Sequence, residues 1–347
     1  MNEMNTTAQP TKRIEYIDAL RGFTMTLVVF YHVAFFCWKI IGLGISVHDY
    51  LLQVRMPMFF FISGFVLYKA EVVWDARQVY RFLRKKLSVQ ILAPFIFFLV
   101  FIHVNDIPLL EGLIAPTKKG YWFTYVLFEY YIFYVVMRFI FNERWANILL
   151  LLLGFILFFI NWAPFYHWIP LPESVKGALS MQCWCYFLFF VFGTLVKKNF
   201  ALVEKLLDSY WLITVCVLFY FLGNFFREYL LFSESISRLL LTTTGLVVLF
   251  SFFRKKQALF SKSTVIGRSL QYVGRRTLDV YLIHYFLIPK SLSFITVFTD
   301  HPMPIIEASV SLVITIIIIA GCLLIGNIIR LSPFLAHWAF GAKKVKN

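Results

Sequence analysis

The sequence predicts an all-α polytopic membrane protein with about ten transmembrane helices. Of its 347 residues, 60% are hydrophobic and only 15% are charged. Soluble domains average roughly 25% charged residues, so this chain has too few polar side chains to cover a globule in water. Apolar runs close to ~20 residues, the length that crosses a bilayer as a helix, recur along the whole sequence. A soluble fold is therefore excluded.

Ten apolar segments define the expected spans. They cover residues 17–40, 50–70, 87–104, 121–141, 146–163, 178–196, 210–226, 236–253, 277–298 and 305–328. We expect residues 1–13 to form a disordered polar tail, residues 14–332 a transmembrane domain and residues 333–347 a basic C-terminal tail. Asp18 and Arg21 interrupt the first run and no small-residue cleavage signal follows it, which indicates an uncleaved helix.

Lys and Arg are distributed unequally between the two sets of connections. With ten spans both termini lie on one side, and the connections on that side hold 24 of the 33 Lys and Arg residues, against eight on the other side. Cytosolic connections of membrane proteins carry the excess of Lys and Arg. We therefore expect both termini in the cytosol, and the net charge of +15 reflects this orientation rather than nucleic-acid binding.

The first span carries ionisable side chains on one face. Arg21 and His32 lie eleven positions apart, which on a helix is three turns plus about 20°, or about 16 Å along the axis. Asp18 lies near the same stripe. Lipid offers such groups no partner, so the face must line a polar cavity or meet polar groups from other helices. The alternative is a structural Arg21 paired with Asp18 or with carbonyl oxygens, and a hydrogen-bonded buried His32.

The second span contains a small-residue pair in an aromatic run. Ser63 and Gly64 stand within Phe59–Phe65, read as FFFISGF. A Ser-Gly pair lets two helices approach closely in a membrane. It permits such an approach to the first helix, and the alternative, which this motif alone favours, is ordinary helix packing.

A basic stripe follows the second span. Arg77, Arg81, Arg84 and Lys85 stand at positions i, i+4, i+7 and i+8, so a helix here presents them on one side. Guanidinium groups bind phosphate through paired hydrogen bonds, which suits a polyanion such as a nucleotide. The alternative is a positively charged anchor on anionic lipid headgroups.

Three further polar groups lie in later spans. Tyr281 and His284 share a helix face at i and i+3, and Glu129 is a lone carboxylate in an aromatic run. Glu129 is expected to partner His32, Arg21 or a substrate, or else to form a structural pair with another helix. A hydrogen-bonded buried histidine is the alternative for His284. The five Cys residues have no metal-ligand spacing and no nucleotide-binding fingerprint occurs, so we expect neither a metal nor a resident cofactor.

These motifs together resemble those of acyltransferase family 3, a family of integral-membrane acyltransferases. The resemblance covers nearly the whole chain in order. It rests on Asp18-Ala-Leu-Arg21-Gly22, the Arg21-to-His32 spacing, FFFISGF, Arg81-x-x-Arg84, Tyr121-Trp122-Phe123 and Tyr281-Leu-Ile-His284.

The resemblance implies transfer of an acyl group, usually acetyl, from cytosolic acyl-CoA to a hydroxyl of a cell-envelope carbohydrate or lipid-linked glycan, in a bacterial cytoplasmic membrane. Arg21 and His32 would be catalytic, with His32 acting as the base or, alternatively, as a transient acyl carrier. Asp18, Glu129, Tyr281 and His284 would act in support. Arg81 and Arg84, with Arg77 and Lys85 of the same stripe, would hold the CoA phosphates. Many relatives carry a further extracytoplasmic hydrolase-like domain, which we do not expect in this chain.

A transporter or flippase for a polar or lipid-linked glycan is the alternative function. It would use the polar face of the first span as a permeation path. The two functions differ at the basic stripe, because an acyl-CoA enzyme needs a phosphate site and a flippase does not. No internal repeat is evident, which weakens a transporter built on inverted halves.

Overall fold

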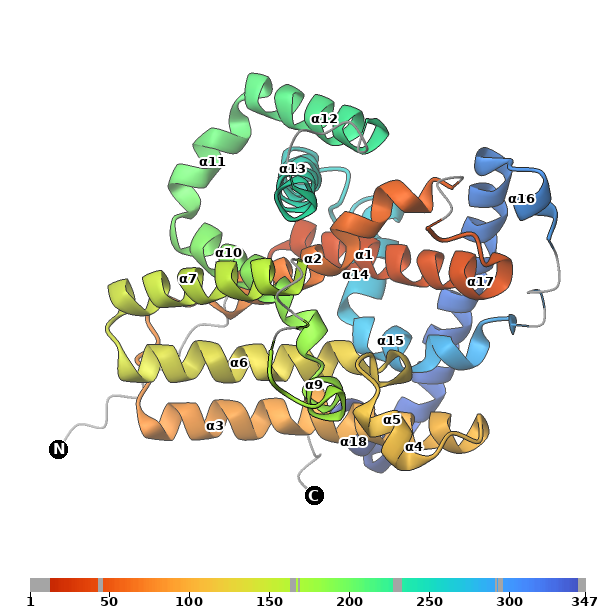
Figure 1. Cartoon of the computed structure of the whole chain (residues 1–347), viewed down its shortest axis with the longest axis horizontal. Coiled ribbons are helices and arrows are strands. Elements are labelled where there is room, and N and C mark those ends of the chain that lie inside the picture. Colours follow the sequence, from red (N-terminus) through yellow and green to blue (C-terminus); the bar gives the residue numbers. More distant parts are fainter. Residues whose placement is uncertain are drawn as a thin grey trace.

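The computed structural model describes residues 13–42, 46–162, 167, 169–226, 233–290, 292 and 296–342, which contain helices and no strands. The helices are α1 (Glu15–Val33), η1 (Ala34–Trp38), α2 (His48–Leu67), α3 (Ala76–Leu87), η2 (Ser88–Leu92), α4 (Ala93–Val104), α5 (Leu109–Ile114), η3 (Lys118–Gly120), α6 (Trp122–Ile140), α7 (Glu143–Trp162), α9 (Glu173–Ala178), η4 (Met181–Tyr186), α10 (Phe187–Lys198), α11 (Phe200–Asp208), α12 (Tyr210–Phe225), α13 (Glu234–Lys255), α14 (Val265–Arg275), α15 (Thr277–Leu287), α16 (Val297–Asp300), α17 (Pro304–Leu331) and α18 (Pro333–Phe340). Figure 1 shows their arrangement.

The prediction of an all-α chain with many spans is confirmed, but the described residues contain fewer than ten long apolar helices. Within the described ranges, seven helices are long and apolar enough to cross a bilayer, and an eighth results if α10 and α11, bent by 96°, are taken as one span. The expected seventh span is only the shorter α12. The expected ninth span, 277–298, contains the 11-residue helix α15, which is about 16 Å long and cannot cross alone.

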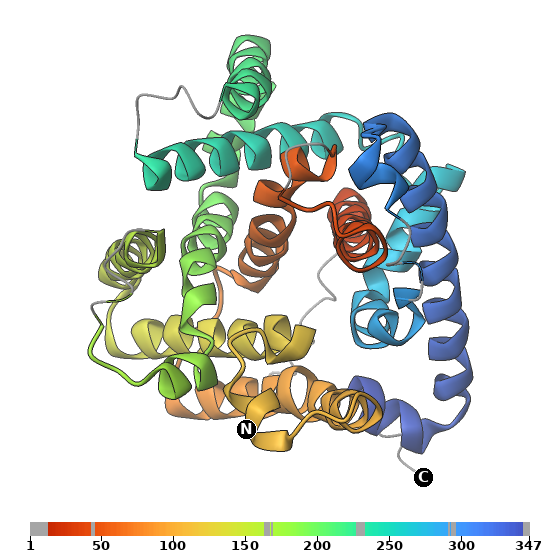
Figure 2. The same cartoon turned by 45° about the vertical axis from the view of Figure 1, so that its right-hand side comes forward.

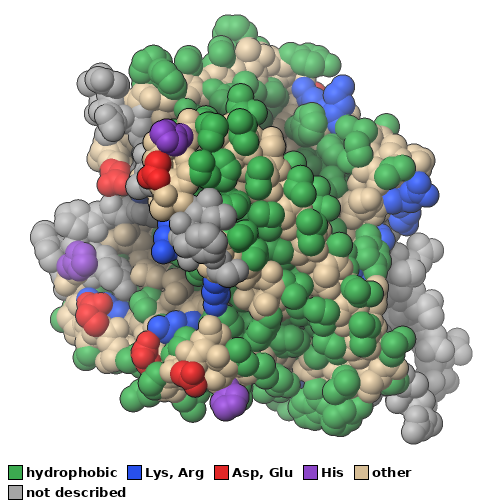
Figure 3. All heavy atoms as spheres, turned by 90° about the vertical axis from the view of Figure 1, so that its right-hand side faces the viewer, with side chains coloured by type: hydrophobic (Ala, Val, Ile, Leu, Met, Phe, Trp, Pro, Cys, Tyr) green, Lys and Arg blue, Asp and Glu red, His purple; other side chains and the backbone are tan. Residues whose placement is uncertain are grey.

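The outer surface carries the apolar side chains that a lipid environment requires. On α17, Ile316, Ile317, Leu324 and Ile328 are each more than half exposed. Apolar side chains also spread over much of the face that Figure 3 shows. Such large exposed apolar areas are stable against lipid tails and not against water. The chain is therefore a multi-pass membrane protein.

Helices α1 and α2 lie at the centre of the bundle. Figure 2 shows them inside a ring of other helices, with α13, α10, α6 and α17 around them. Helix α1 packs closely on α14, and α2 packs closely on α10. Side chains on the inner faces of α1 and α2 are consequently shielded from lipid, which is where a polar site can be placed.

Two glycine crossings bring these pairs into backbone contact. A Cβ atom on Gly22 of α1 would lie 1.9 Å from the carbonyl oxygen of Leu270, and one on Gly274 of α14 would lie 1.8 Å from that of Asp18. Gly64 of α2 makes an equally close approach, 1.9 Å, to the carbonyl oxygen of Phe190. The Ser63-Gly64 pair therefore serves ordinary helix packing, the favoured alternative for this motif, and the closest approach of Gly64 is to α10 rather than to the first helix.

The basic stripe and the C-terminal segment are more helical than expected. Helix α3 carries the stripe and continues through the π-helical turn η2 into α4, so that Ala76–Val104 forms one span of 29 residues. Residues 333–340 of the expected C-terminal tail form α18, whose Phe340 is buried. Residues 1–12 of the expected N-terminal tail and residues 343–347 lie outside the described residues. The side of the membrane on which the termini lie stays a prediction.

Candidate active site

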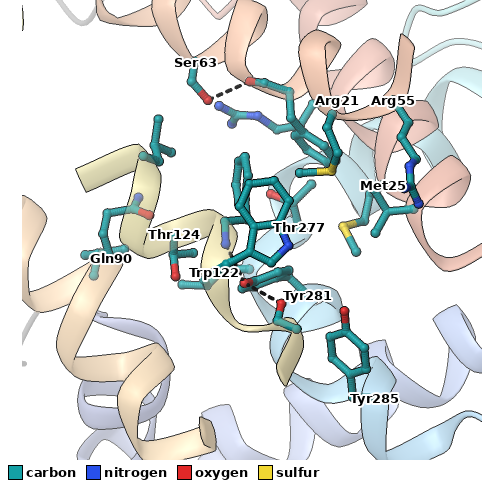
Figure 4. A pocket seen from close by; sticks show the side chains of 18 of the residues that line it. Arg21, Met25, Arg55, Ser63, Gln90, Trp122, Thr124, Thr277, Tyr281 and Tyr285 are labelled. Atoms are coloured by element: carbon teal, nitrogen blue, oxygen red, sulfur yellow. Dashed lines mark hydrogen bonds between the residues drawn. The ribbon is translucent and has the colours of Figure 1, made fainter. Parts of the chain in front are cut away.

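A cavity of about 310 Å³, the Arg21 cavity, opens between α1, α2, α6 and α15. Arg21 and His32 both line it, as their helical spacing predicts, with Met25 and Val28 between them on the same stripe. In Figure 4, Arg21, Trp122 and Tyr285 point from three helices toward one space. The complete lining is Arg21, Met25, Val28, His32, Arg55, Met56, Phe59, Ser63, Lys86, Val89, Gln90, Gly120, Trp122, Phe123, Thr124, Leu127, Tyr131, Thr277, Leu278, Tyr281 and Tyr285.

A second and larger cavity of about 830 Å³, the Lys290 cavity, lies beyond His32. Five residues line both cavities, and we call them the shared wall: His32, Arg55, Gly120, Trp122 and Tyr285. Two π-helical turns border these spaces, with Phe35 and Phe36 of η1 lining the Lys290 cavity and Val89 and Gln90 of η2 lining the Arg21 cavity. Such turns are frequent at functional sites because they re-aim side chains.

Hydrogen bonds fix the proton positions on His32. The Nδ1 atom of His284 lies 2.8 Å and 3.0 Å from the carbonyl oxygens of Tyr281 and Val280. A carbonyl oxygen only accepts, so in the neutral ring Nδ1 of His284 carries the proton and Nε2 accepts. Nδ1 of His32, 3.1 Å from that Nε2, must then donate. The Nε2 lone pair of His32 is left to accept the Tyr285 hydroxyl proton, at 3.0 Å.

The turn before α6 holds α15 in place beside His32. The Tyr281 hydroxyl donates to the Gly120 carbonyl oxygen at 3.1 Å and accepts from the Phe123 N–H at 3.2 Å. Gly120 has a φ of +111°, and a Cβ atom there would lie 2.4 Å from the Tyr285 ring. Only glycine combines this backbone angle with the space that Tyr285 occupies. Gly120 therefore determines where the Tyr285 hydroxyl meets His32.

Three cations line the Arg21 cavity. They are Arg21, Arg55 and Lys86. The Arg55 guanidinium lies 3.3 Å from the centre of the Tyr31 ring, and its buried Nε has no hydrogen-bond acceptor. Among the described residues no carboxylate lies within 4.0 Å of Arg21 or of Arg55. Buried cations normally have a partner, so this cavity suits an anionic ligand or an anionic reaction intermediate.

A comparison of the sequence with models of protein families identifies the family of this chain. The family model described as an acyltransferase domain, acyltransferase family 3, matches residues 14–326. The chain belongs to this acyltransferase family. Neither the curated proteins nor the solved structures give a match to the chain.

Two of the supporting residues predicted for the acyltransferase lie away from both cavities. Glu129 accepts a hydrogen bond from the Trp184 indole N–H at 2.8 Å, which corresponds to the structural pairing considered above. Asp18 is partly buried on α1, and no hydrogen bond or ion pair between Asp18 and Arg21 is found in the described part of the chain. In contrast, Tyr281 lines the Arg21 cavity and His284 contacts His32 directly.

The predicted phosphate-binding stripe of the acyltransferase lies outside the cavity lining. Arg77, Arg81, Arg84 and Lys85 are all exposed on α3. Lys86 lies about 180° around the helix from Arg77, and it is the cation of α3 that lines the cavity. Its ammonium group lies 4.2 Å from the centre of the Tyr131 ring. Phosphate binding by the stripe therefore remains a prediction, and it applies to phosphate groups that stay outside the helix bundle.

Sequence reasoning did not single out Arg55, Lys86, Gly120 or Tyr285 as site residues. Arg55 had the same signal as Arg21, an ionisable residue within an apolar span. The signal for Tyr285 was its position directly after His284. The signal for Lys86 was its position on the face of α3 opposite the basic stripe. Gly120 had no local signal, because its role depends on a contact with Tyr285 from a distant part of the chain.

Proposed function

We propose that this acyltransferase moves an acyl group, most simply acetyl, from acyl-CoA to a hydroxyl group of a cell-envelope carbohydrate or lipid-linked glycan. The observation that carries the proposal is the position of His32 in the shared wall, where its Nε2 lone pair already accepts a hydrogen bond from a hydroxyl group, that of Tyr285. A donor in one cavity and an acceptor in the other would meet at this atom. The charge distribution supports placing the Arg21 cavity on the cytosolic side, and the family resemblance supports a bacterial cytoplasmic membrane.

The Arg21 cavity suits the donor. Its volume of about 310 Å³ matches a slender chain rather than a nucleotide. We propose that the acyl-pantetheine arm enters it, with Lys86 and Arg21 along its path. The CoA phosphates would remain outside, where Arg77, Arg81, Arg84 and Lys85 are exposed. This arrangement reconciles the predicted phosphate site with its position outside the cavity.

The Lys290 cavity suits a carbohydrate acceptor. Its lining combines aromatic rings with side-chain amides, among them Phe36, Trp122, Asn105 and Gln182. Aromatic faces pack on the apolar faces of sugar rings, and amides hydrogen-bond to hydroxyl groups. A volume of about 830 Å³ lies within the range of small-molecule sites.

The reaction needs a base and a stabiliser for negative charge. The acceptor hydroxyl replaces Tyr285 at Nε2 of His32 and gives up its proton there as its oxygen attacks the thioester carbon. Arg55, in the shared wall, stabilises the oxyanion of the tetrahedral intermediate. The C–S bond then breaks, and His32 returns the proton to the CoA sulfur. Ester and CoA thiol are the products, and His32 regains its starting state.

Labelled acetyl-CoA tests the proposed reaction. Membranes containing the full chain should transfer label to envelope glycan, and mass spectra of that glycan should gain one acetyl unit. General-base catalysis contributes about 10²–10⁴-fold, so His32→Ala should lower transfer by that factor. His103→Ala, at an exposed histidine that lines neither cavity, is the matched control and should retain activity. Full acetylation by a folded His32→Ala protein would refute the assignment.

The phosphate site has its own test. The double variant Arg81→Ala/Arg84→Ala should raise KM for acetyl-CoA about ten-fold or more, because each lost phosphate contact removes a charge-assisted hydrogen bond. The KM for S-acetylpantetheine, which lacks the phosphates of CoA, should not change. An equal rise for both donors would show that the stripe supports the fold rather than the phosphates.

A further inference from the structure

The Lys290 cavity collects cations on the side of the protein where cations are rare. In the predicted topology, only eight of the 33 Lys and Arg residues lie on the side opposite the termini. Three of those eight, Arg55, Lys119 and Lys290, line this one cavity. The positive-inside rule disfavours cations on that side, so their concentration at one site needs a separate reason.

The charges of these cations are not balanced within the described lining. None of the described residues around the cavity is Asp or Glu. Lys119 pairs with Glu111 at 2.7 Å, outside the lining. Lys290 donates to the Asn105 side-chain oxygen at 3.2 Å and lies 5.2 Å from the centre of the Phe101 ring. Asn105 and Phe101 are neutral partners, so neither of them balances the charge of Lys290.

Arg55 adds the second unbalanced charge at the inner end of the cavity. Its closest partner in the described chain is the neutral side chain of Tyr31, and its Nε has no acceptor. Burying a cation without an anion is costly in a low-dielectric site, so such a group is retained where a ligand supplies the missing charge. Arg55 and Lys290 together give the cavity a net positive charge that neutral sugar hydroxyls cannot offset.

We propose that the acceptor carries an anionic group, a carboxylate or a phosphate, in addition to the hydroxyl that is acylated, and that Arg55 and Lys290 bind this group. The inference rests on the proposed function for its acceptor, and adds the substrate class. Arg55 has five N–H donors in a planar fork, so one edge of its guanidinium binds the two oxygens of a carboxylate or phosphate while its other donors remain for the oxyanion, whereas Lys290 acts as a point charge. Binding near Arg55 places the anionic substrate against the shared wall that holds His32.

Matched pairs of small acceptors test the proposal on the full chain in lipid nanodiscs. The carboxylate pair is p-nitrophenyl β-glucuronide and p-nitrophenyl β-glucoside, and the phosphate pair is N-acetylglucosamine 1-phosphate and methyl N-acetylglucosaminide. Binding is measured without acyl-CoA, from tryptophan fluorescence or the shift in melting temperature. We expect the anionic member of at least one pair to bind ten-fold or more tightly than its neutral partner, and the responding pair identifies the anion.

Variants locate the anion. Arg55→Gln and Lys290→Gln should each reduce the preference for the anionic probe at least five-fold and leave binding of the neutral probe unchanged. Arg55→Lys should keep part of the preference. Lys39→Gln is the matched control, because Lys39 is an exposed cation assigned to the same side that lines neither cavity. It should leave the preference unchanged.

The outcomes separate this inference from the proposed reaction. Equal binding within both pairs, no binding of any probe, or a preference that survives in both Gln variants would overturn the anionic site. Acetyl transfer to neutral and anionic acceptors at equal KM would also overturn it while leaving the proposed reaction intact. An anionic preference that depends on Arg55 and Lys290, without any acetyl transfer on adding acetyl-CoA, supports the anionic site and refutes the reaction.

Discussion

The hydrogen bond between His284 and His32 gives the sharpest quantitative prediction. Replacing His284 by Phe removes the acceptor, 3.1 Å away, that holds the proton on Nδ1 of His32. His32 then either leaves a buried N–H unpaired or adopts the other tautomer, whose Nε2 carries a proton and cannot act as a base. The Phe ring fills the same buried position, so the packing of α15 should persist.

The size of the effect follows from the bond that is lost. An unpaired buried donor costs about 1–3 kcal/mol, and each 1.36 kcal/mol in the barrier is a ten-fold change in rate. We therefore expect His284→Phe to lower kcat by about 5- to 150-fold. KM for acyl-CoA should change little, because His284 does not line the Arg21 cavity.

His284→Gln is the matched control. A Gln side chain places an amide oxygen near the position of the lost ring nitrogen and can accept the His32 proton. It should restore kcat to within about five-fold of the parent protein, with both variants melting close to the parent in detergent. The assay is initial-rate acetyl transfer by purified protein. A His284→Phe protein with undiminished kcat, or a Gln variant as slow as the Phe variant, would refute this role.

Three further substitutions test the framework around the site. Gly120→Ala should lower kcat ten-fold or more, because the new Cβ would lie 2.4 Å from the Tyr285 ring, and an unchanged rate would contradict the proposed placement of that ring. Gly274→Val should reduce the melting temperature by several degrees or abolish expression, since its Cβ would lie 1.8 Å from the Asp18 carbonyl oxygen and overpacking costs about 1–3 kcal/mol. Lys118→Met should destabilise the protein by about 2 kcal/mol or more, because the Lys118 ammonium lies 2.6–3.3 Å from four backbone carbonyl oxygens. Melting in detergent measures both stability effects, and a Lys118→Met protein that melts with the parent would show that water replaces the amine.

The helical period was enough to predict that Arg21 and His32 line one cavity. Their spacing lies within one continuous helix, so the geometry depends on no other part of the chain. The apolar runs likewise predicted the all-α membrane fold. They overestimated the number of long helices, because an apolar run does not reveal where a helix ends. The α-helix that begins at Thr277 ends at Leu287, and the backbone bends at Ile288.

Sequence patterns could not predict contacts between segments that are distant in the chain. The spacing of Asp18 and Arg21 left a structural pair open as an alternative, and no hydrogen bond or ion pair joins them among the described residues. The carboxylate of Glu129 has a partner, Trp184, on another helix. The two π-helical turns shift the helical register by an amount that no sequence period indicates. Arg55 shows the opposite case, because its position in an apolar span was informative and only its location on the shared wall required coordinates.

The division of the interior by the shared wall has an energetic consequence for the proposed reaction. If the thioester is in the Arg21 cavity and the alcohol in the Lys290 cavity, ester synthesis transfers an acyl group toward the outer side. The proton of the alcohol ends on the CoA thiol at the cytosolic side. On each side of the membrane, the reactant and the product then carry the same net charge. The equilibrium of acylation would consequently be indifferent to the voltage across the bilayer and to a pH gradient, and the thioester alone would drive modification of the far surface.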